Sequence, residues 1–192
     1  MAGPARRFAT YEDVLSAPEH MVAEVLNGEL YTSPRPAGPH AEAASVLGMD
    51  VGGAFHRGRG GPGGWIILDE PELHLGPDIL VPDLAGWHRS RLPGVPHAAF
   101  IELAPDWACE VISPRSQRID RERKLPIYAR ERVTNVWLVD PLARMIEVYR
   151  LDGESYRLLV TRGGVDSVRL EPFEALELEL AALWPAAASD AK

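Results

Sequence analysis

Residues 107–112 (WACEVI) constrain the fold more than any other part of this sequence, because they are apolar except for Glu110. A short run that is apolar on both alternating sides is typical of a strand buried on both faces. Such a strand needs neighbouring strands at its edges and other elements against its faces. The segment therefore predicts a covered sheet at the centre of the fold.

The rest of the chain supplies elements for such a sheet. Two hairpins are expected, at residues 22–33 around Asn27-Gly28 and at residues 145–161 around Asp152-Gly153. Further strands are expected at residues 65–68, 73–75, 79–87, 100–103 and 136–139. Helices are expected at residues 11–16, 40–51, 117–130 with a kink at Pro126, and 173–183, and a flexible glycine-rich loop at residues 52–64. This order predicts a mixed α/β fold, with a central mixed sheet flanked by helices and with N-terminal and C-terminal hairpins.

The length of 192 residues favours a single domain. Hydrophobic residues make up 46% of the chain, and no apolar run approaches the roughly 20 residues of a membrane span. Cys109 is the only cysteine, so an intrachain disulfide is excluded, and no secretory signal is evident. We therefore expect a cytoplasmic protein that does not enter the membrane.

Two acids lie in apolar strand segments. Glu110 is the only charge in WACEVI, and Asp83 lies in ILVPDLAGW after a proline that favours extended backbone. A buried acid is costly unless it is paired, hydrogen-bonded or bound to a metal. Two acids on neighbouring strands repel each other, and a divalent cation with oxygen ligands relieves that repulsion. The pair therefore indicates a site for Mg²⁺ or Mn²⁺.

Lys124 is unusual because almost every other basic residue of the chain is an arginine. Eighteen of the 20 basic residues are arginine, and the other lysine is Lys192 at the last position, so Lys124 is the only internal lysine. A lysine can place a compact charge against a single oxygen, or act as an amine whose pKa is tuned near a water molecule. An arginine guanidinium does neither of these well. Composition alone leaves a functional lysine and a chance occurrence both open.

Charge is segregated along the chain. The formal net charge of −8 is unusual for a protein that contacts nucleic acid. Residues 113–132, however, have a local balance of +4, whereas residues 171–184 contain four glutamates and no basic residue. The basic segment fits a phosphate-binding surface or, equally well, a solvated helix face with Arg/Glu pairs.

Three stretches, VAEVLNGELYTSPRP, VPDLAGW and CEVISPRSQRIDRERKLPIYARERVTNVWLVDP, resemble the Uma-type putative restriction endonuclease family, a branch of the PD-(D/E)XK nuclease superfamily. The resemblance covers roughly residues 8–185, which would form the core of one nuclease-like domain. It implies a central mixed sheet with helices on both sides and a metal held by Asp83 and Glu110. The implied reaction is the hydrolysis of DNA phosphodiester bonds.

This sequence departs from the superfamily motif at the lysine. That motif places the lysine two positions after the acid, where this chain has Ile112, and the family resemblance moves the role to Lys124 on the following helix. Asp78, in GPDI, is a rival for the Pro-Asp position, but we prefer Asp83 because its surroundings are those of a strand. At SPRS the family commonly has Ser-Pro-Ser-Thr, so Arg115 either contacts phosphate or faces water.

The resemblance and the implied metal-dependent hydrolysis suggest further site residues. The backbone carbonyl of Val111 would complete the metal site, with Glu29 and His40 as accessory residues. Glu29 could equally be an outward-facing strand acid, and His40 a histidine that begins a helix. The expected phosphate-binding residues are Arg57, Arg59, Arg89, Arg115, Arg118 and Arg121.

The sequence thus predicts a Mg²⁺-dependent endonuclease (or Mn²⁺-dependent), with DNA as its partner. A homodimer would supply two active sites for cleavage of both strands. One alternative is a catalytically lapsed module of nuclease fold that binds nucleic acid or protein, which the negative net charge favours. Another is a buried structural ion pair with one spare acid.

Overall fold

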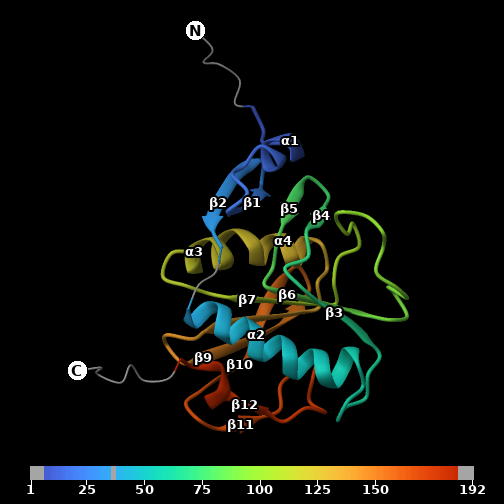
Figure 1. The fold of residues 1–192 in the computed structure, drawn as a ribbon, viewed down its shortest axis with the longest axis vertical. Coiled ribbons are helices and arrows are strands. Elements are labelled where there is room, and N and C mark those ends of the chain that lie inside the picture. The colour runs from blue at the N-terminus through green and yellow to red at the C-terminus, as the bar shows by residue number, and fades with distance from the viewer. Residues whose placement is uncertain (1–6, 36–37, 186–192) are drawn as a thin grey trace, which may run out of the picture.

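A six-stranded mixed sheet lies at the centre of the computed structural model, which describes residues 7–35 and 38–185 (Figure 1). Its strand order is β10-β9-β8-β7-β6-β3. The pair β7 and β8 is parallel, and the other neighbouring pairs are antiparallel. The WACEV segment is β7 and has a neighbour on each side, so the predicted central mixed sheet is confirmed. The strands are β3 (Trp65–Asp69), β6 (Leu84–His88), β7 (Trp107–Val111), β8 (Asn135–Asp140), β9 (Met145–Asp152) and β10 (Ser155–Gly163).

A second, four-stranded antiparallel sheet has the order β2-β1-β5-β4. Its N-terminal hairpin turns at Asn27 and Gly28, which have positive φ angles of 53° and 78°. Asn and Gly are the residues that adopt positive φ most readily in such turns. Pro82 has no N–H to give to a ladder, and Asp83 lies just after it, between β5 and β6. The strands of this sheet are β1 (Met21–Leu26), β2 (Glu29–Pro34), β4 (Leu73–Leu75) and β5 (Asp78–Leu80); a separate ladder pairs β11 (Ser167–Val168) with β12 (Leu178–Glu179).

The helical segment predicted at residues 117–130 is confirmed but is irregular. It consists of α3 (Gln117–Ile119), the π-helical turn η2 (Asp120–Lys124) and α4 (Leu125–Arg130). Pro126 has no N–H for the carbonyl of Glu122, four residues earlier, and Glu122 lies inside the π turn. The irregularity expected at Pro126 therefore falls one turn earlier, in the turn that carries Lys124.

The helices near the N-terminus lie close to their predicted positions. In α1 (Tyr11–Leu15), the Asp13 carboxylate accepts a hydrogen bond from the N–H of Thr10, and α2 (Pro39–Val51) begins with a proline. The predicted flexible loop at residues 52–64 is partly wrong, because α2 continues into the π-helical turn η1 (Gly52–His56). Phe55 in this turn is buried and packs its ring against Phe173, which orders the start of the glycine-rich segment.

The two faces of β7 pack against different helices. Trp107 shares a hydrophobic core with Leu47 of α2, whereas its neighbour Ala108 belongs to a second core with Tyr128 of α4. Full burial of a large apolar side chain such as Leu47 contributes about 1.5–3 kcal/mol. Because side chains alternate along a strand, Glu110 points to the same side as Ala108 and faces the helical segment that carries Lys124.

The helix predicted at residues 173–183 is wrong. Residues 178–179 form β12, and only the short 3₁₀ turn η3 (Leu180–Leu183) is helical. The reason is the packing of Phe173, whose ring makes edge contacts with the rings of Trp65 and Trp107 in the core. Aromatic packing of this kind overrides the helical pattern of the local sequence.

The remaining predictions concern the second hairpin, one strand and the membrane. The hairpin of β9 and β10 is confirmed, whereas the strand predicted at residues 100–103 is reduced to a single bridge between Leu73 and Ile101. Within residues 7–35 and 38–185, the structure has no helix that is both long and apolar enough to cross a membrane.

Candidate functional site

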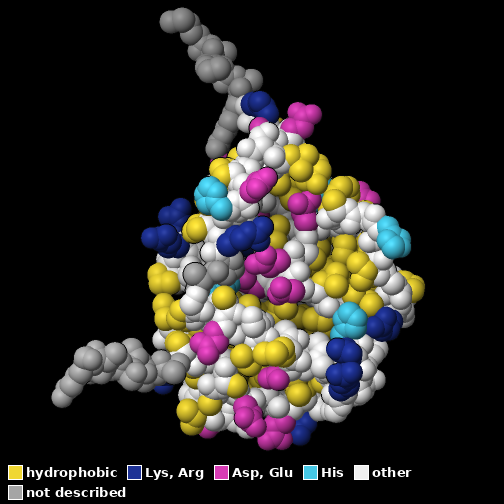
Figure 2. All heavy atoms as spheres, viewed as in Figure 1, with side chains coloured by type: hydrophobic (Ala, Val, Ile, Leu, Met, Phe, Trp, Pro, Cys, Tyr) yellow, Lys and Arg dark blue, Asp and Glu magenta, His cyan; other side chains and the backbone are white. Residues whose placement is uncertain are grey.

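A pocket of about 550 Å³ opens where the two sheets meet the start of α2 and the turn η2. Figure 2 shows acidic side chains near the middle of the visible face, with a basic side chain beside them. Acids outnumber bases in the pocket wall, which includes Glu24, Glu70, Asp83, Glu110 and Asp120 on one hand and Arg35, Arg115 and Lys124 on the other. The pocket therefore combines the two predicted metal-binding acids with the predicted lysine.

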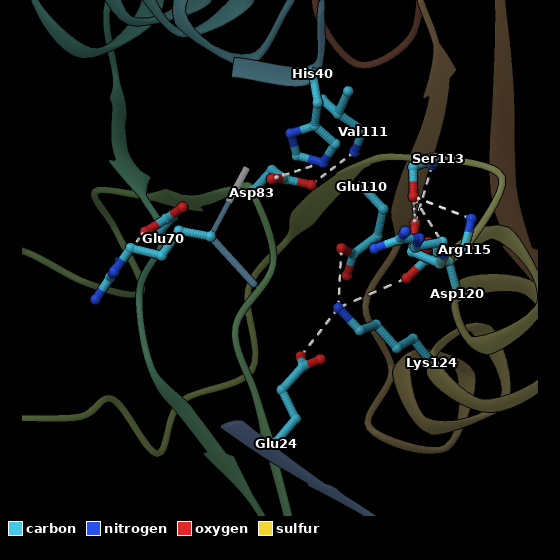
Figure 3. Close-up of polar contacts among 12 residues, drawn as sticks. Glu24, His40, Glu70, Asp83, Glu110, Val111, Ser113, Arg115, Asp120 and Lys124 are labelled. Atoms are coloured by element: carbon cyan, nitrogen blue, oxygen red, sulfur yellow. Dashed lines mark hydrogen bonds and ion pairs between the residues drawn. The ribbon is translucent and has the colours of Figure 1, made fainter. Parts of the chain in front are cut away.

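Lys124 lines the pocket and lies among three carboxylates (Figure 3). Its Nζ is 2.9 Å from Glu24 Oε1, 3.1 Å from Glu110 Oε2 and 3.7 Å from Asp120 Oδ1. Burial disfavours the ammonium, but the charges of Glu110, Glu24 and Asp120 outweigh it and raise the pKa of Lys124 well above its usual value. Lys124 therefore stays a cation at neutral pH.

Glu110 is buried in β7 and is held at both oxygens. Its Oε2 accepts a hydrogen bond from Lys124, and its Oε1 accepts one of 2.6 Å from the hydroxyl of Tyr128. Burial raises the pKa of Glu110 well above its usual value, although the charge of Lys124 acts in the opposite direction. This carboxylate is fixed in place and costly to ionise.

Asp83 lies beside Glu110 because β6 pairs with β7. Its Oδ2 accepts a hydrogen bond of 2.7 Å from the N–H of Val111, and its Oδ1 is 3.4 Å from Nε2 of His40. Burial raises the pKa of Asp83 to about 7, against the opposing effects of the Val111 N–H and of Lys124. Near neutral pH this carboxyl is thus balanced between its charged and neutral forms.

His40 lies on α2, over Asp83 and Val111 (Figure 3). Burial lowers the pKa of His40, which favours the neutral imidazole at pH 7. Its Nδ1 is buried and has no hydrogen-bond partner among the described residues. The wall of the pocket therefore contains an unsatisfied polar atom, on the ring whose Nε2 faces Asp83.

The charges around Lys124 fit a divalent cation. Burial raises the pKa of Asp120 as well as those of Asp83 and Glu110, so these acids together resist full ionisation beside one ammonium. A cation with oxygen ligands would allow them to ionise together. No three His, Cys, Asp or Glu side chains of the described residues form a ready-made metal cage. Mg²⁺ needs no such cage, because it is commonly held by one or two carboxylates together with water and substrate phosphate.

Asp78, the rival of Asp83, lies outside the pocket. Its carboxylate is fully buried, accepts a hydrogen bond from the N–H of Asn27 and forms an ion pair of 2.6 Å with Arg130. Asp78 therefore joins the β1–β2 turn to α4. The preferred acid, Asp83, is the one that the structure places next to Glu110.

The other predicted site residues are more dispersed. Glu29 accepts a hydrogen bond of 2.8 Å from the hydroxyl of Tyr31 and does not belong to the pocket wall, which Val111 and His40 do line. Ile112, at the position of the usual lysine, is buried in the core. The structure thus brings Asp83, Glu110, Val111, His40 and Lys124 together and leaves Glu29 aside.

Of the six arginines predicted to bind phosphate, Arg115 alone lines the pocket. The guanidinium of Arg121 is bound by Glu147 at 2.6 and 3.1 Å, and Arg118 lies 3.5 Å from Glu122. Arg89 donates a hydrogen bond to the carbonyl of His56. The other two, Arg57 and Arg59, line a separate depression of about 360 Å³ at the end of α2.

Sequence reasoning missed several residues of the pocket. Glu24 lies in the apolar segment MVAEVL and gave the same signal as Glu110, namely an acid in a buried strand. Asp120 lies four residues before Lys124, a spacing that brings helical side chains together. Glu70 has a left-handed backbone with φ of 42°, and forms a 3.2 Å ion pair with Arg35 at the pocket mouth. Nothing in the local sequence indicated that pair.

Comparisons with known proteins agree with this architecture. The model of the family Uma2, described as "Putative restriction endonuclease", matches residues 8–182. A crystal structure described as a putative nuclease belonging to DUF820, from Anabaena variabilis ATCC 29413, is similar with a TM-score of 0.75 and 22% sequence identity, covering 92% of this chain and 97% of that one. This similarity shows the restriction-endonuclease-like fold. No curated protein matches the chain. Since the family match extends over nearly all of the chain, the protein belongs to the Uma2 family of putative restriction endonucleases.

Proposed function

We propose that the protein is a metal-dependent endonuclease that hydrolyses phosphodiester bonds of DNA. One observation carries the proposal: Asp83, Glu110 and Lys124 come from separate segments and line a single pocket, with Lys124 Nζ 3.1 Å from Glu110 Oε2. Family membership supports nuclease activity in general. The metal is inferred from the chemistry of these side chains, and the DNA substrate from the resemblance to restriction endonucleases.

The carboxylates of Asp83 and Glu110, with the backbone carbonyl of Val111, would hold Mg²⁺ or Mn²⁺. When bound, such an ion polarises a phosphoryl oxygen and acidifies a water molecule. The N–H of Val111 fixes the orientation of Asp83, and the hydroxyl of Tyr128 fixes that of Glu110. Both ligands are therefore oriented before the ion arrives, which lowers the cost of assembling the site.

Lys124 supplies the positive charge of the chain itself. A buried ammonium beside the reacting phosphate stabilises the additional negative charge that develops as water attacks phosphorus. It can also orient the attacking water through one of its three N–H groups. Arg115 and Arg35 at the pocket mouth would contact neighbouring phosphates, positioning the strand without reading its bases.

Supercoiled plasmid provides the test, because one cut per molecule converts it to an open circle. Wild-type protein should nick it with Mg²⁺ or Mn²⁺, and Lys124→Ala should not. Thermal melting with and without Mn²⁺ should accompany the assay, since it shows whether each variant is folded and whether it binds the ion. Equal nicking by wild type and Lys124→Ala would contradict the proposal.

A further inference from the structure

Glu24 touches the candidate site at two points, although it comes from β1 of the smaller sheet. Its Oε1 is 2.9 Å from Lys124 Nζ, the shortest of the three distances between this ammonium and a carboxylate. The same oxygen accepts a hydrogen bond of 2.8 Å from the N–H of Val81. Val81 precedes Asp83 by two residues in the connection between the sheets. One buried oxygen thus links the lysine with the backbone that carries Asp83.

We infer that Glu24 is a positioning residue, which holds the Lys124 ammonium against Glu110 and keeps Asp83 aligned with both. The inference rests on the proposed nuclease function and adds a role to that site. In Figure 3 Glu24 approaches Lys124 from the side opposite Glu110. The ammonium is therefore held between two strands that belong to different sheets.

The other two carboxylates near Lys124 cannot hold its ammonium in a fixed position relative to both sheets. Asp120 lies on the same π turn, 3.7 Å away, and moves with the lysine, so it cannot fix the turn relative to the sheets. Glu110 is itself a proposed metal ligand. A lysine side chain is a flexible four-carbon stem, and an ammonium without a fixed partner samples several positions. Glu24 supplies that partner from outside the helical segment.

Glu24→Gln removes the charge of this residue and leaves its size almost unchanged. The glutamine has the same length and keeps an oxygen that can accept from the N–H groups of Val81 and Lys124, but it loses the negative charge that strengthens the contact with the ammonium. We expect kcat to fall about 10- to 100-fold, the usual effect of removing a residue that orients a catalytic group. The dissociation constant for Mn²⁺ should change less than kcat, because the backbone next to Asp83 keeps its hydrogen bond from the N–H of Val81.

The decisive measurement follows Lys124 itself and needs no activity. Reductive methylation with formaldehyde and borane labels lysines, and mass spectrometry gives the rate at each site. The chain has two lysines, so Lys192 is an internal reference in every sample. Lys124 should be labelled much more slowly in folded wild type than in urea-unfolded protein, because its side chain is 6% exposed in the folded structure. Glu24→Gln should accelerate labelling of Lys124 about tenfold, as expected when the acceptor of a hydrogen bond from an ammonium loses its charge.

Asp78→Asn is the matched control. Asp78 is also a buried acid of the smaller sheet, but it binds Asn27 and Arg130 outside the pocket. This variant should melt at a lower temperature while Lys124 labelling and nicking remain those of wild type. The inference is overturned if Glu24→Gln leaves Lys124 labelling or kcat unchanged, or if Asp78→Asn changes the labelling equally. A wild-type protein that nicks nothing contradicts the proposed function instead, and the labelling rates still decide whether Glu24 positions Lys124.

Discussion

Lys124 and Glu110 are fourteen residues apart in sequence, and their side chains meet in the interior with 3.1 Å between Nζ and Oε2. In the usual motif of the superfamily the acid and the lysine share one strand. Here the lysine is carried by a π-helical turn that packs over the strand of the acid. In this chain Ile112 therefore lies in the core, and the helical segment supplies the ammonium of the pocket.

Removing the Lys124 ammonium should lower stability as well as cleavage. Lys124→Ala leaves Glu24, Glu110 and Asp120 buried without their cation, and breaking a buried ion pair costs about 3–5 kcal/mol. Part of that cost should be recovered when the acids take up protons, so the deficit should be smaller at pH 5 than at pH 8. Urea unfolding at both pH values measures it, and a variant as stable as wild type at pH 8 would show that the carboxylates are not ionised there.

Metal binding should depend on Asp83. Mn²⁺ at about a hundred times its dissociation constant should stabilise wild type by about 2.7 kcal/mol, seen as a higher melting temperature. Asp83→Asn should abolish this increment, because one of the two carboxylate ligands is lost. Asp78→Asn, with its amide outside the pocket, should melt lower but keep the full increment. An undiminished response in Asp83→Asn would place the ion elsewhere.

Glu147 should contribute stability that is lost in acid. Burial tends to raise its pKa, but hydrogen bonds from Arg121 and Tyr149 and the charge of Arg121 lower the pKa below the ordinary value of 4.5. A lowered pKa in the folded state stabilises the protein above about pH 4.5, and this contribution disappears as the pH falls through the folded pKa.

Glu147→Gln should therefore be less stable than wild type at pH 7, by about 1 kcal/mol for a partly exposed pair, and the gap should narrow as the pH falls below the ordinary pKa of 4.5. Urea unfolding across this range measures both curves. Glu122→Gln, which removes the exposed partner of Arg118, is the control and should change little at either pH. A gap that stays constant with pH would show that the Glu147 charge does not matter.

Arg115 should contact DNA, whereas Arg118 should not. Arg115 lines the pocket, and Arg118 lies outside the pocket wall, 3.5 Å from Glu122. Arg115→Ala should weaken binding to DNA and reduce the slope of log affinity against log salt by about one, as expected for one phosphate contact. Binding measured by fluorescence anisotropy without divalent ions avoids cleavage. Equal slopes for Arg115→Ala and wild type would remove Arg115 from the interface.

The helices and strands with a clear hydrophobic periodicity or turn motif of their own were predictable from the sequence. The apolar run of β7 and the Asn27-Gly28 hairpin depend on local periodicity and turn geometry, and both formed where expected. The helix predicted at residues 173–183 failed because Phe173 packs into a cluster of tryptophans contributed by distant strands. A contact between segments so far apart in the sequence cannot be predicted from the hydrophobic pattern of residues 173–183 alone.

The candidate site was predictable only in part, because the sequence indicated Asp83 and Glu110 but not the other acids of the pocket, Glu24, Glu70 and Asp120. Asp83 and Glu110 stood out because acids in apolar strands need a partner. The place of Lys124 came from the family resemblance. The helical segment after Glu110 is irregular, so its sequence does not tell where a side chain fourteen residues after Glu110 points. The partners of Glu24 and Arg121 depend on how sheets and helix pack together, which the sequence does not specify locally.

The most direct test of the account is plasmid nicking by the wild-type protein and Lys124→Ala in parallel, with Mg²⁺, Mn²⁺ or Ca²⁺. Circular dichroism and melting on the same samples confirm that the variant is folded. The account predicts open-circular DNA from wild type with Mg²⁺ or Mn²⁺, and only supercoiled DNA from folded Lys124→Ala. Nicking by the variant at the wild-type rate, or no nicking by wild type with any of the three ions, would contradict it.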